Sequence, residues 1–144
     1  MFHNQEPISA EVQVTKKTVL VVEDDTGIGS FLVQTIVQET PYQALLVTDG
    51  FQALNVINDI KPHLFILDYL LPRMNGIELY DRLRTIHGLE EIPAIMISAR
   101  LPKHEIEKRS LIGLSKPFEL DKLLDTIEKL LEERVNKEHR NQIN

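Results

Sequence analysis

Short apolar runs recur along most of the chain, and segments of a different periodicity separate them. Five runs of four or five residues are mainly apolar, at positions 19–22, 44–47, 64–67, 94–97 and, more weakly, 111–115. Because a strand turns alternate residues to opposite faces, a run without polar interruptions is typical of a strand that is buried on both faces. The pattern therefore predicts five strands of the kind found in parallel sheets.

The segments after these runs place apolar residues three or four positions apart, which indicates amphipathic helices. Helices are predicted around 28–36, 53–60, 77–86 and 120–131, whereas 104–110 is long enough for only a short fourth helix. Strands that alternate with helices through short connections favour right-handed crossovers. We therefore predict an α/β fold, a doubly wound five-stranded parallel sheet in the flavodoxin-like order 2-1-3-4-5, with helices on both faces and helix four shortened.

Both ends of the chain are polar. Positions 1–17 have no clear period and are expected to form a flexible leader, and positions 135–144 a polar C-terminal tail. Positions 18–134 then form one domain, since 144 residues leave room for a single domain with tails. No linker to a second domain is evident, so we expect a stand-alone domain.

Composition narrows the classes of function. The formal net charge of −6 argues against non-specific binding to nucleic acid or to anionic membranes. The chain has no cysteine, which excludes disulfides and thiolate metal sites. No apolar run approaches the roughly 20 residues that span a bilayer, and the N-terminus lacks a signal-peptide pattern. We expect a cytoplasmic protein that contacts neither membranes nor nucleic acid directly.

Polar side chains suited to chemistry gather at the ends of the predicted strands. Glu23 and Asp24 follow the first strand, Asp68 ends the third, Ser98 the fourth and Lys116 the fifth. In a parallel sheet these ends share one edge, and in the order 2-1-3-4-5 the first and third strands are neighbours about 4.8 Å apart. The three carboxylates are therefore expected to crowd one small pocket.

Carboxylates that crowd together repel one another unless a cation joins them. Their oxygen atoms suit a hard ion such as Mg²⁺, and no cluster of His or Cys points to zinc. With that ion, the Lys116 ammonium and the Ser98 hydroxyl would hold the oxygens of a phosphoryl group, and the Asp68 carboxylate is a plausible nucleophile. Each residue taken singly is more often a solvated strand end, a turn or a surface lysine, so the prediction depends on their convergence.

Four stretches of the chain resemble the receiver domains of two-component response regulators. They are Val19 to Asp25, Leu67 to Gly76, Ile97 to Ala99, and Lys116 to Phe118. Each stretch alone is weak evidence, but all four occur in order at the predicted strand ends. The resemblance extends over roughly 18–134, nearly all of the predicted domain.

The resemblance implies roles for the acidic residues of the pocket. Asp68 looks like the phosphorylated residue, and Asp24 looks like a direct ligand of Mg²⁺ (or Mn²⁺). Glu23 would act on the metal through a water molecule. The backbone carbonyl of Leu70 would complete the metal site, with Asp68 as a further ligand. Asp25 matches no ligand and is expected to begin the first helix.

The resemblance also implies roles for the remaining polar residues. Ser98 matches the switch hydroxyl of the family, and Lys116 matches its lysine, whose bond to the following proline (here Pro117) is often cis. Positions Leu70 and Arg100 resemble sites that tune dephosphorylation.

A receiver of this kind takes its phosphoryl group from a phosphohistidine, so the implied partner is a sensor histidine kinase or a histidine phosphotransfer protein. The signal would pass on to an unknown downstream protein, and pairing as a homodimer remains open. We do not expect an enzyme that acts on other substrates, although a receiver can catalyse its own phosphorylation and dephosphorylation.

The chain departs from the family pattern beside the pocket. Receivers usually carry an aromatic residue three positions before the lysine, where this chain has Gly113. The stretch between Ser98 and Lys116 is also about one helical turn shorter than usual. An alternative is therefore a non-switching, pseudo-receiver module of the same fold that binds proteins through a constitutive surface.

Two enzyme or cofactor classes fit less well. Haloacid-dehalogenase-like phosphatases usually carry a second Asp two residues after the nucleophile, where this chain has Leu70. A flavodoxin would have a phosphate loop rich in Ser, Thr and Gly after the first strand, and this chain has none.

Overall fold

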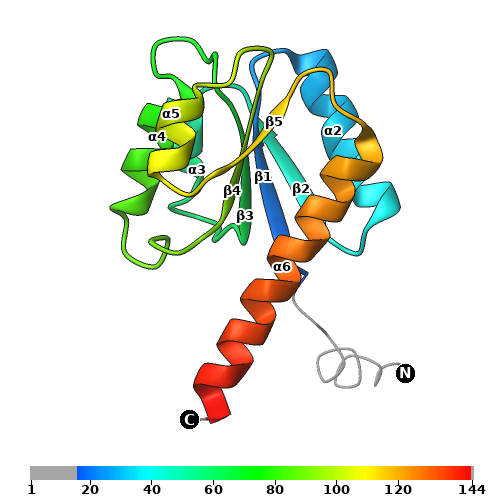
Figure 1. Ribbon diagram of the computed structural model, residues 1–144, viewed down its shortest axis with the longest axis vertical. Coiled ribbons are helices and arrows are strands. Elements are labelled where there is room, and N and C mark those ends of the chain that lie inside the picture. The colour runs from blue at the N-terminus through cyan, green and yellow to red at the C-terminus, as the bar shows by residue number, and fades with distance from the viewer. Residues whose placement is uncertain (1–15, 144) are drawn as a thin grey trace, which may run out of the picture.

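A computed structural model describes residues 16–143, with side chains described as far as residue 132. Five strands form one parallel sheet in the order β2-β1-β3-β4-β5, which confirms the predicted fold and strand order (Figure 1). The strands are β1 (Thr18–Val22), β2 (Gln43–Val47), β3 (Leu64–Asp68), β4 (Ala94–Ser98) and β5 (Ile112–Ser115).

Helices cover both faces of the sheet (Figure 1). On one face lie α3 (Gly50–Val56), α4 (Gly76–Arg84) and α5 (Lys103–Lys108), and on the other lie α2 (Thr26–Glu39) and α6 (Leu120–Ile143). Each face has its own hydrophobic cluster, and the central strands contribute to both by alternation. In β1, Leu20 packs with the first cluster and Val21 with the second, which explains why the apolar run has no polar interruption.

Short polar side chains begin three of the helices. The Asp25 carboxylate accepts a hydrogen bond from the Ile28 amide at 3.0 Å, which confirms the predicted start of the first helix. Asp49 caps α3 in the same way. Asn75 and Glu78 form a capping box at the start of α4, each side chain accepting a hydrogen bond from the other residue's amide.

The helix between β4 and β5 is short, as predicted. Helix α5 has six residues, and Ile106 is its buried side chain. Just beyond it, Arg109 donates to both carboxylate oxygens of Asp81 in α4, at 2.7 and 2.8 Å, and to Glu105 at 2.7 Å. Arg109 therefore ties the end of α5 to α4 through a charged fork.

The structure describes most of the predicted C-terminal tail but little of the predicted N-terminal leader. Helix α6 continues to Ile143, so the last helix is longer than the apolar pattern predicted and includes most of the expected tail at 135–144. The predicted leader lies almost wholly outside the described residues. Within 16–143, no helix is both long enough and apolar enough to cross a membrane.

We expect Arg109→Met to lower the midpoint of thermal unfolding by about 3 °C, because it removes the link between α4 and α5. The hydrogen bond from Arg109 lowers the pKa values of Asp81 and Glu105 below their ordinary 3.8 and 4.5. Carboxylates with lowered pKa values stabilise the fold above their ordinary pKa and lose that contribution as the pH falls. The difference between variant and wild type should therefore shrink below this pH range. A difference independent of pH from neutrality to pH 3 would contradict this assignment.

Candidate metal centre at the carboxyl edge of the sheet

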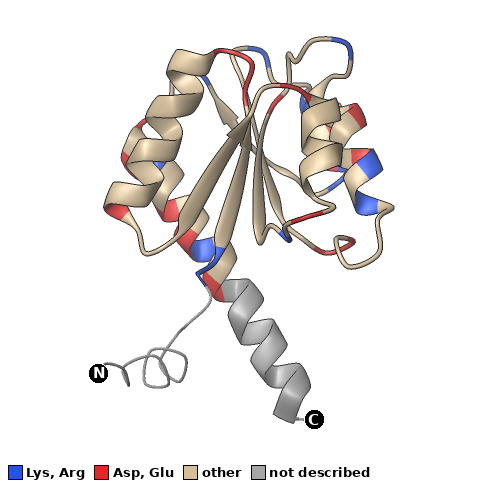
Figure 2. Cartoon of the chain, turned by 180° about the vertical axis from the view of Figure 1, so that it is seen from behind, with Lys and Arg blue, Asp and Glu red and all other residues tan. Residues whose placement is uncertain are grey.

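Three carboxylates meet where β1 and β3 end. Glu23 and Asp24 follow β1 directly, Asp68 is the last residue of β3, and Val22 pairs with Leu67 in the sheet. Oxygen atoms from the three side chains lie within 4.8 Å of one another. Glu23 and Asp68 are only 1% and 5% exposed, whereas Asp24 faces solvent. The predicted convergence of these residues is therefore confirmed, and acidic positions follow the upper ends of the central strands in Figure 2.

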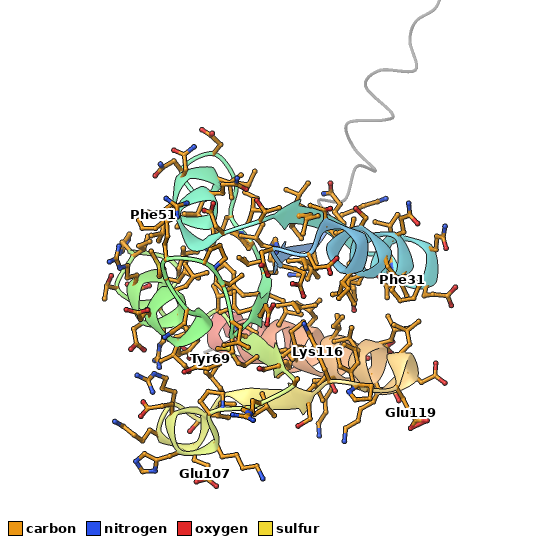
Figure 3. All side chains as sticks on the ribbon, turned by 90° about the horizontal axis from the view of Figure 1, so that it is seen from above. Phe31, Phe51, Tyr69, Glu107, Lys116 and Glu119 are labelled. Atoms are coloured by element: carbon orange, nitrogen blue, oxygen red, sulfur yellow. The ribbon has the colours of Figure 1, made fainter. Side chains whose placement is uncertain are left out.

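Lys116 extends over this edge from the segment that follows β5. Its ammonium nitrogen lies 3.2 Å from Glu23 Oε1 and 3.6 Å from Asp68 Oδ2. The Lys116 amide donates to the Ser98 carbonyl at 2.9 Å, and the Lys116–Pro117 bond is cis, as the resemblance implied. Figure 3 looks onto this edge from above, with Lys116 and Tyr69 near its centre.

The pKa values reflect crowded charge. Burial alone would lower the pKa of Lys116, but attraction from Asp68 and Glu23 outweighs it, and the pKa lies above its ordinary value. Burial, followed by a hydrogen bond with Asp68, raises the pKa of Glu23. The hydrogen bond from Lys116 opposes the rise at Glu23 but does not cancel it. Additional positive charge at this edge is therefore favourable.

The donor set fits a hard divalent cation. All the convergent side-chain donors are carboxylate oxygens, which are the ligands that Mg²⁺ and Mn²⁺ accept in proteins. Glu23, Asp24 and Asp68 would hold such an ion, as the sequence predicts. Their spacing, within 4.8 Å, is short enough for one ion to be shared. No other group of three or more His, Cys, Asp or Glu side chains with this geometry occurs in the described part of the chain.

Ser98 lies at the same edge, but its hydroxyl is engaged elsewhere. The side chain is 1% exposed, and Asp68 pairs with the preceding residue, Ile97, in the sheet. The Ser98 hydroxyl accepts from the Arg100 amide at 3.1 Å and donates to the Arg100 carbonyl at 3.2 Å. Contact with a group bound at Asp68 would require the hydroxyl to exchange these partners.

The loop after Asp68 begins against the acidic cluster. The Leu70 amide donates to Asp68 Oδ1 at 3.3 Å, and the Leu70 side chain is 61% exposed. Ligation of a metal by the Leu70 carbonyl stays a prediction. Gly76 closes the loop, and a Cβ atom there would lie 2.5 Å from the Asp68 carbonyl oxygen. In the sequence Gly76 is only the end of a stretch that resembles the family, since close approach of two backbones leaves no local signal.

The place expected for an aromatic side chain is occupied by aliphatic ones. A Cβ atom at Gly113 would lie 3.0 Å from Ile106 Cδ1 and 3.1 Å from Leu101 Cδ1. Leu101 precedes α5 and Ile106 belongs to it, so the segment between β4 and β5 folds back onto the glycine. The departure from the family pattern pointed to Gly113 but not to Leu101 or Ile106. Their apolar character within an otherwise polar segment was the available signal.

We expect Lys116→Met to destabilise the metal-free protein by about 2 kcal/mol, because Glu23 and Asp68 would lose the cation that faces them. Millimolar Mg²⁺ should restore part of this stability, since a bound ion supplies the missing charge. Urea unfolding in EDTA and in Mg²⁺ measures both effects. Lys122→Met, on the exposed side of α6, is the matched control and should change neither. Equal stability of Lys116→Met and wild type in EDTA would contradict the assigned ion pair.

We expect Gly113→Tyr to cost about 2 kcal/mol of folding stability, because Leu101 and Ile106 already fill the space beside it. Adding Leu101→Ala to Gly113→Tyr should recover much of that loss by making room for the ring. Gly113→Ala is the milder control, since side-chain ends need to shift by only a few tenths of an ångström. Destabilisation by Gly113→Tyr that Leu101→Ala does not relieve would refute this packing.

Comparison with known proteins places the chain in a family. It matches the response regulator receiver domain over residues 19–128. It is 30% identical over 122 residues to sporulation initiation phosphotransferase F of Bacillus subtilis (strain 168), covering 82% of this chain and 96% of that protein. It is also 27% identical over 119 residues to the polar-differentiation response regulator DivK of Brucella anthropi, covering 80% and 96%.

A solved structure agrees with this relationship. The chemotaxis response regulator CheY4 of Vibrio cholerae superposes with a TM-score of 0.71 at 27% sequence identity, covering 81% of this chain and 99% of that one. The family match includes the acidic edge described above. It also includes all five strands, apart from the first residue of β1. The chain belongs to the response regulator receiver domain family.

Proposed function

We propose that this receiver accepts a phosphoryl group on Asp68 from a phosphohistidine, with Mg²⁺ or Mn²⁺ held by Glu23, Asp24 and Asp68. One observation carries the proposal. The Asp68 carboxylate lies among two other carboxylates, within 4.8 Å, and 3.6 Å from the Lys116 ammonium. A carboxylate so placed has both a site for a divalent ion and a fixed cation beside it, which together suit attack on a phosphoryl group.

The transfer step is simple in its covalent chemistry. An oxygen of Asp68 attacks phosphorus, the bond between phosphorus and the donor's imidazole nitrogen breaks, and that nitrogen takes up a proton. When bound, the divalent ion supplies positive charge to the transferring phosphoryl oxygens. Lys116 moves from its pairing with Glu23 and Asp68 toward a second phosphoryl oxygen. The Leu70 amide, now 3.3 Å from Asp68 Oδ1, helps to hold the nucleophile in place.

Ser98 would bind the phosphoryl group once it is attached. Its hydroxyl would leave the Arg100 carbonyl and donate to a phosphoryl oxygen, a charge-assisted bond stronger than the one it replaces. Arg100 and Leu70, which are exposed beside the site, would influence the access of water and thus the lifetime of the phosphoryl group. The chain would catalyse its own phosphorylation and dephosphorylation but turn over no other substrate.

The donor would be a sensor histidine kinase or a histidine phosphotransfer protein. The name of the Bacillus subtilis relative, a phosphotransferase of sporulation initiation, supports a phosphorelay role. An apolar groove beside the site, to which Lys116 itself contributes, offers a protein donor a surface. The groove is lined by Ile28, Phe31, Leu32, Lys116, Pro117, Phe118 and Leu120. Onward signalling would proceed by protein contact in the cytoplasm.

One observation favours a second candidate, a receiver fold that binds partners without switching. Leu101 and Ile106 fill the space beside Gly113, so the side chain whose rotation accompanies switching in the family has no counterpart there. In this case the partner surface would be the same with and without phosphate.

Incubation with Mg²⁺ and a small phosphodonor such as acetyl phosphate tests the chemistry. Intact mass should show one added phosphoryl group on the wild type and none on Asp68→Asn, because the amide is a poor nucleophile. Asp81→Asn, on the exposed side of α4, is the matched control and should be modified like the wild type. A wild type that stays unmodified would refute the proposed function.

The same samples distinguish the two candidates. A switching receiver should change its hydrogen-exchange pattern around residues 99–113 when phosphorylated or treated with a phosphate analogue. A phosphorylated protein with an unchanged pattern and unchanged melting temperature would favour the non-switching module.

A further inference from the structure

The loop that follows Asp68 is fastened to the start of α3 at its tip, far along the loop from the acidic cluster. We propose that Arg73 is a positioning residue of the metal centre, and that with Asp49 and Phe51 it fixes the loop 69–75 and thereby sets the affinity for Mg²⁺. This inference rests on the proposed function, because it concerns the ion held at Asp68.

The backbone of Arg73 is unusual. Its φ angle is 66°, in the left-handed region that residues with a Cβ atom rarely adopt. Ser110 is the other residue besides glycine with a positive φ in the described chain. A residue held in this conformation needs surrounding contacts to maintain it, and strained positions of this kind cluster at functional sites.

The contacts of the Arg73 side chain provide that support. One guanidinium nitrogen lies 3.1 Å from Asp49 Oδ2, and the guanidinium carbon lies 4.8 Å from the centre of the Phe51 ring. The Asp49 side chain is 14% exposed and that of Arg73 is 66% exposed, so the carboxylate is shielded from water while most of the Arg73 side chain faces solvent. The other oxygen of Asp49 accepts from the Gln52 amide at 2.8 Å and caps α3. Asp49 is therefore fixed to the helix before it meets Arg73.

The neighbouring residue adds a contact beneath the loop. Met74 is 2% exposed, and its sulfur would lie 2.9 Å from a Cβ atom at Gly50, the first residue of α3. Only a glycine lets Met74 approach this closely. Phe51 lies on α3, away from the centre of the edge viewed in Figure 3. The loop tip thus meets three consecutive residues, Asp49 to Phe51, with a charged contact, a ring contact and an apolar contact.

The base of the same loop belongs to the metal centre. The Tyr69 carbonyl accepts from the Gly76 amide at 2.8 Å and from the Leu71 amide at 3.1 Å. The Leu70 amide donates to the carboxylate of Asp68. Residues 69–76 therefore form a closed loop whose base orients Asp68 and the Leu70 backbone and whose tip is anchored by Arg73. Releasing the tip should let the base move, and a divalent ion with strict geometry should bind more weakly.

Two variants release the anchor in different ways. Arg73→Ala removes the guanidinium but keeps the strained φ angle. Asp49→Asn removes the charge of the partner but keeps the helix cap, since asparagine is an equally good cap. In the metal-free form of both variants, the amide hydrogens of residues 69–75 should exchange faster than in the wild type. Calorimetry should show that both variants bind Mg²⁺ about tenfold more weakly than the wild type. The double variant should bind Mg²⁺ no more weakly than Arg73→Ala, because the contact with Asp49 is already lost in that single variant.

Two further variants separate the loss of the anchor from backbone strain and from the loss of any arginine that lies over a ring. Arg73→Gly relieves the φ strain while removing the anchor, so its melting temperature should exceed that of Arg73→Ala while its Mg²⁺ affinity stays reduced. Arg84→Ala is the matched control, because Arg84 also lies over an aromatic ring, 5.5 Å from the centre of Tyr80, at the far end of α4. It should leave Mg²⁺ affinity and loop exchange unchanged.

The outcomes separate this inference from the proposed function. If the wild type binds Mg²⁺ and Arg73→Ala binds it equally well, the inference is overturned and the proposed function stands. A drop in melting temperature without a change in Mg²⁺ affinity would likewise reduce Arg73 to a purely structural role and overturn it. A wild type that binds no Mg²⁺ would remove the metal centre and this inference together.

Discussion

Negative charge gathered at the ends of β1 and β3 is the constraint on which the rest of the site depends. Two of its three carboxylates are almost fully buried, and a single ammonium, that of Lys116, faces both of them. Ionised groups in such a place are costly unless paired, and one cation cannot fully pair two anions. The edge is thus most stable when it gains positive charge. The excess negative charge that destabilises the metal-free protein at this edge also favours the binding of a divalent ion.

The sheet is what makes this concentration of charge tolerable. Every residue of β3 is buried, and the strand is paired in register with β1 and β4, so the backbone of Asp68 is held next to that of Glu23. Apolar clusters on both faces fix the strands, and the free energy of that packing offsets the repulsion at one end. Lys116 reaches the cluster from two strands away because all parallel strands end at one edge. Stability and chemistry therefore occupy different parts of the same strands.

Sequence patterns predicted the strands, which depend on periodicity, and the shared edge of their ends, which depends on chain direction. Continuous apolar runs identified the strands, and the rule that parallel strands end at one edge brought Asp68, Ser98 and Lys116 together. Contacts between segments far apart in the sequence were not predictable in the same way. Nothing local to Arg73 reveals that it lies against Asp49, and nothing local to Gly113 reveals that Leu101 lies over it. The apolar pattern marks only the first part of α6, since its polar final turns lack the apolar spacing of a packed helix.

The packing around Gly113 bears on how a phosphoryl group on Asp68 would be sensed. The Ser98 hydroxyl makes both of its bonds to Arg100, so its departure would free the backbone directly before Leu101. Leaving the Arg100 carbonyl breaks one neutral hydrogen bond, which costs about 1 kcal/mol, less than a charge-assisted bond to a phosphoryl oxygen returns. Leu101 lies on Gly113, while the end of α5 is tied to α4 through Arg109. A displacement begun at Ser98 would therefore reach Leu101 first, while the contact between Arg109 and Asp81 holds the far end of α5 against α4.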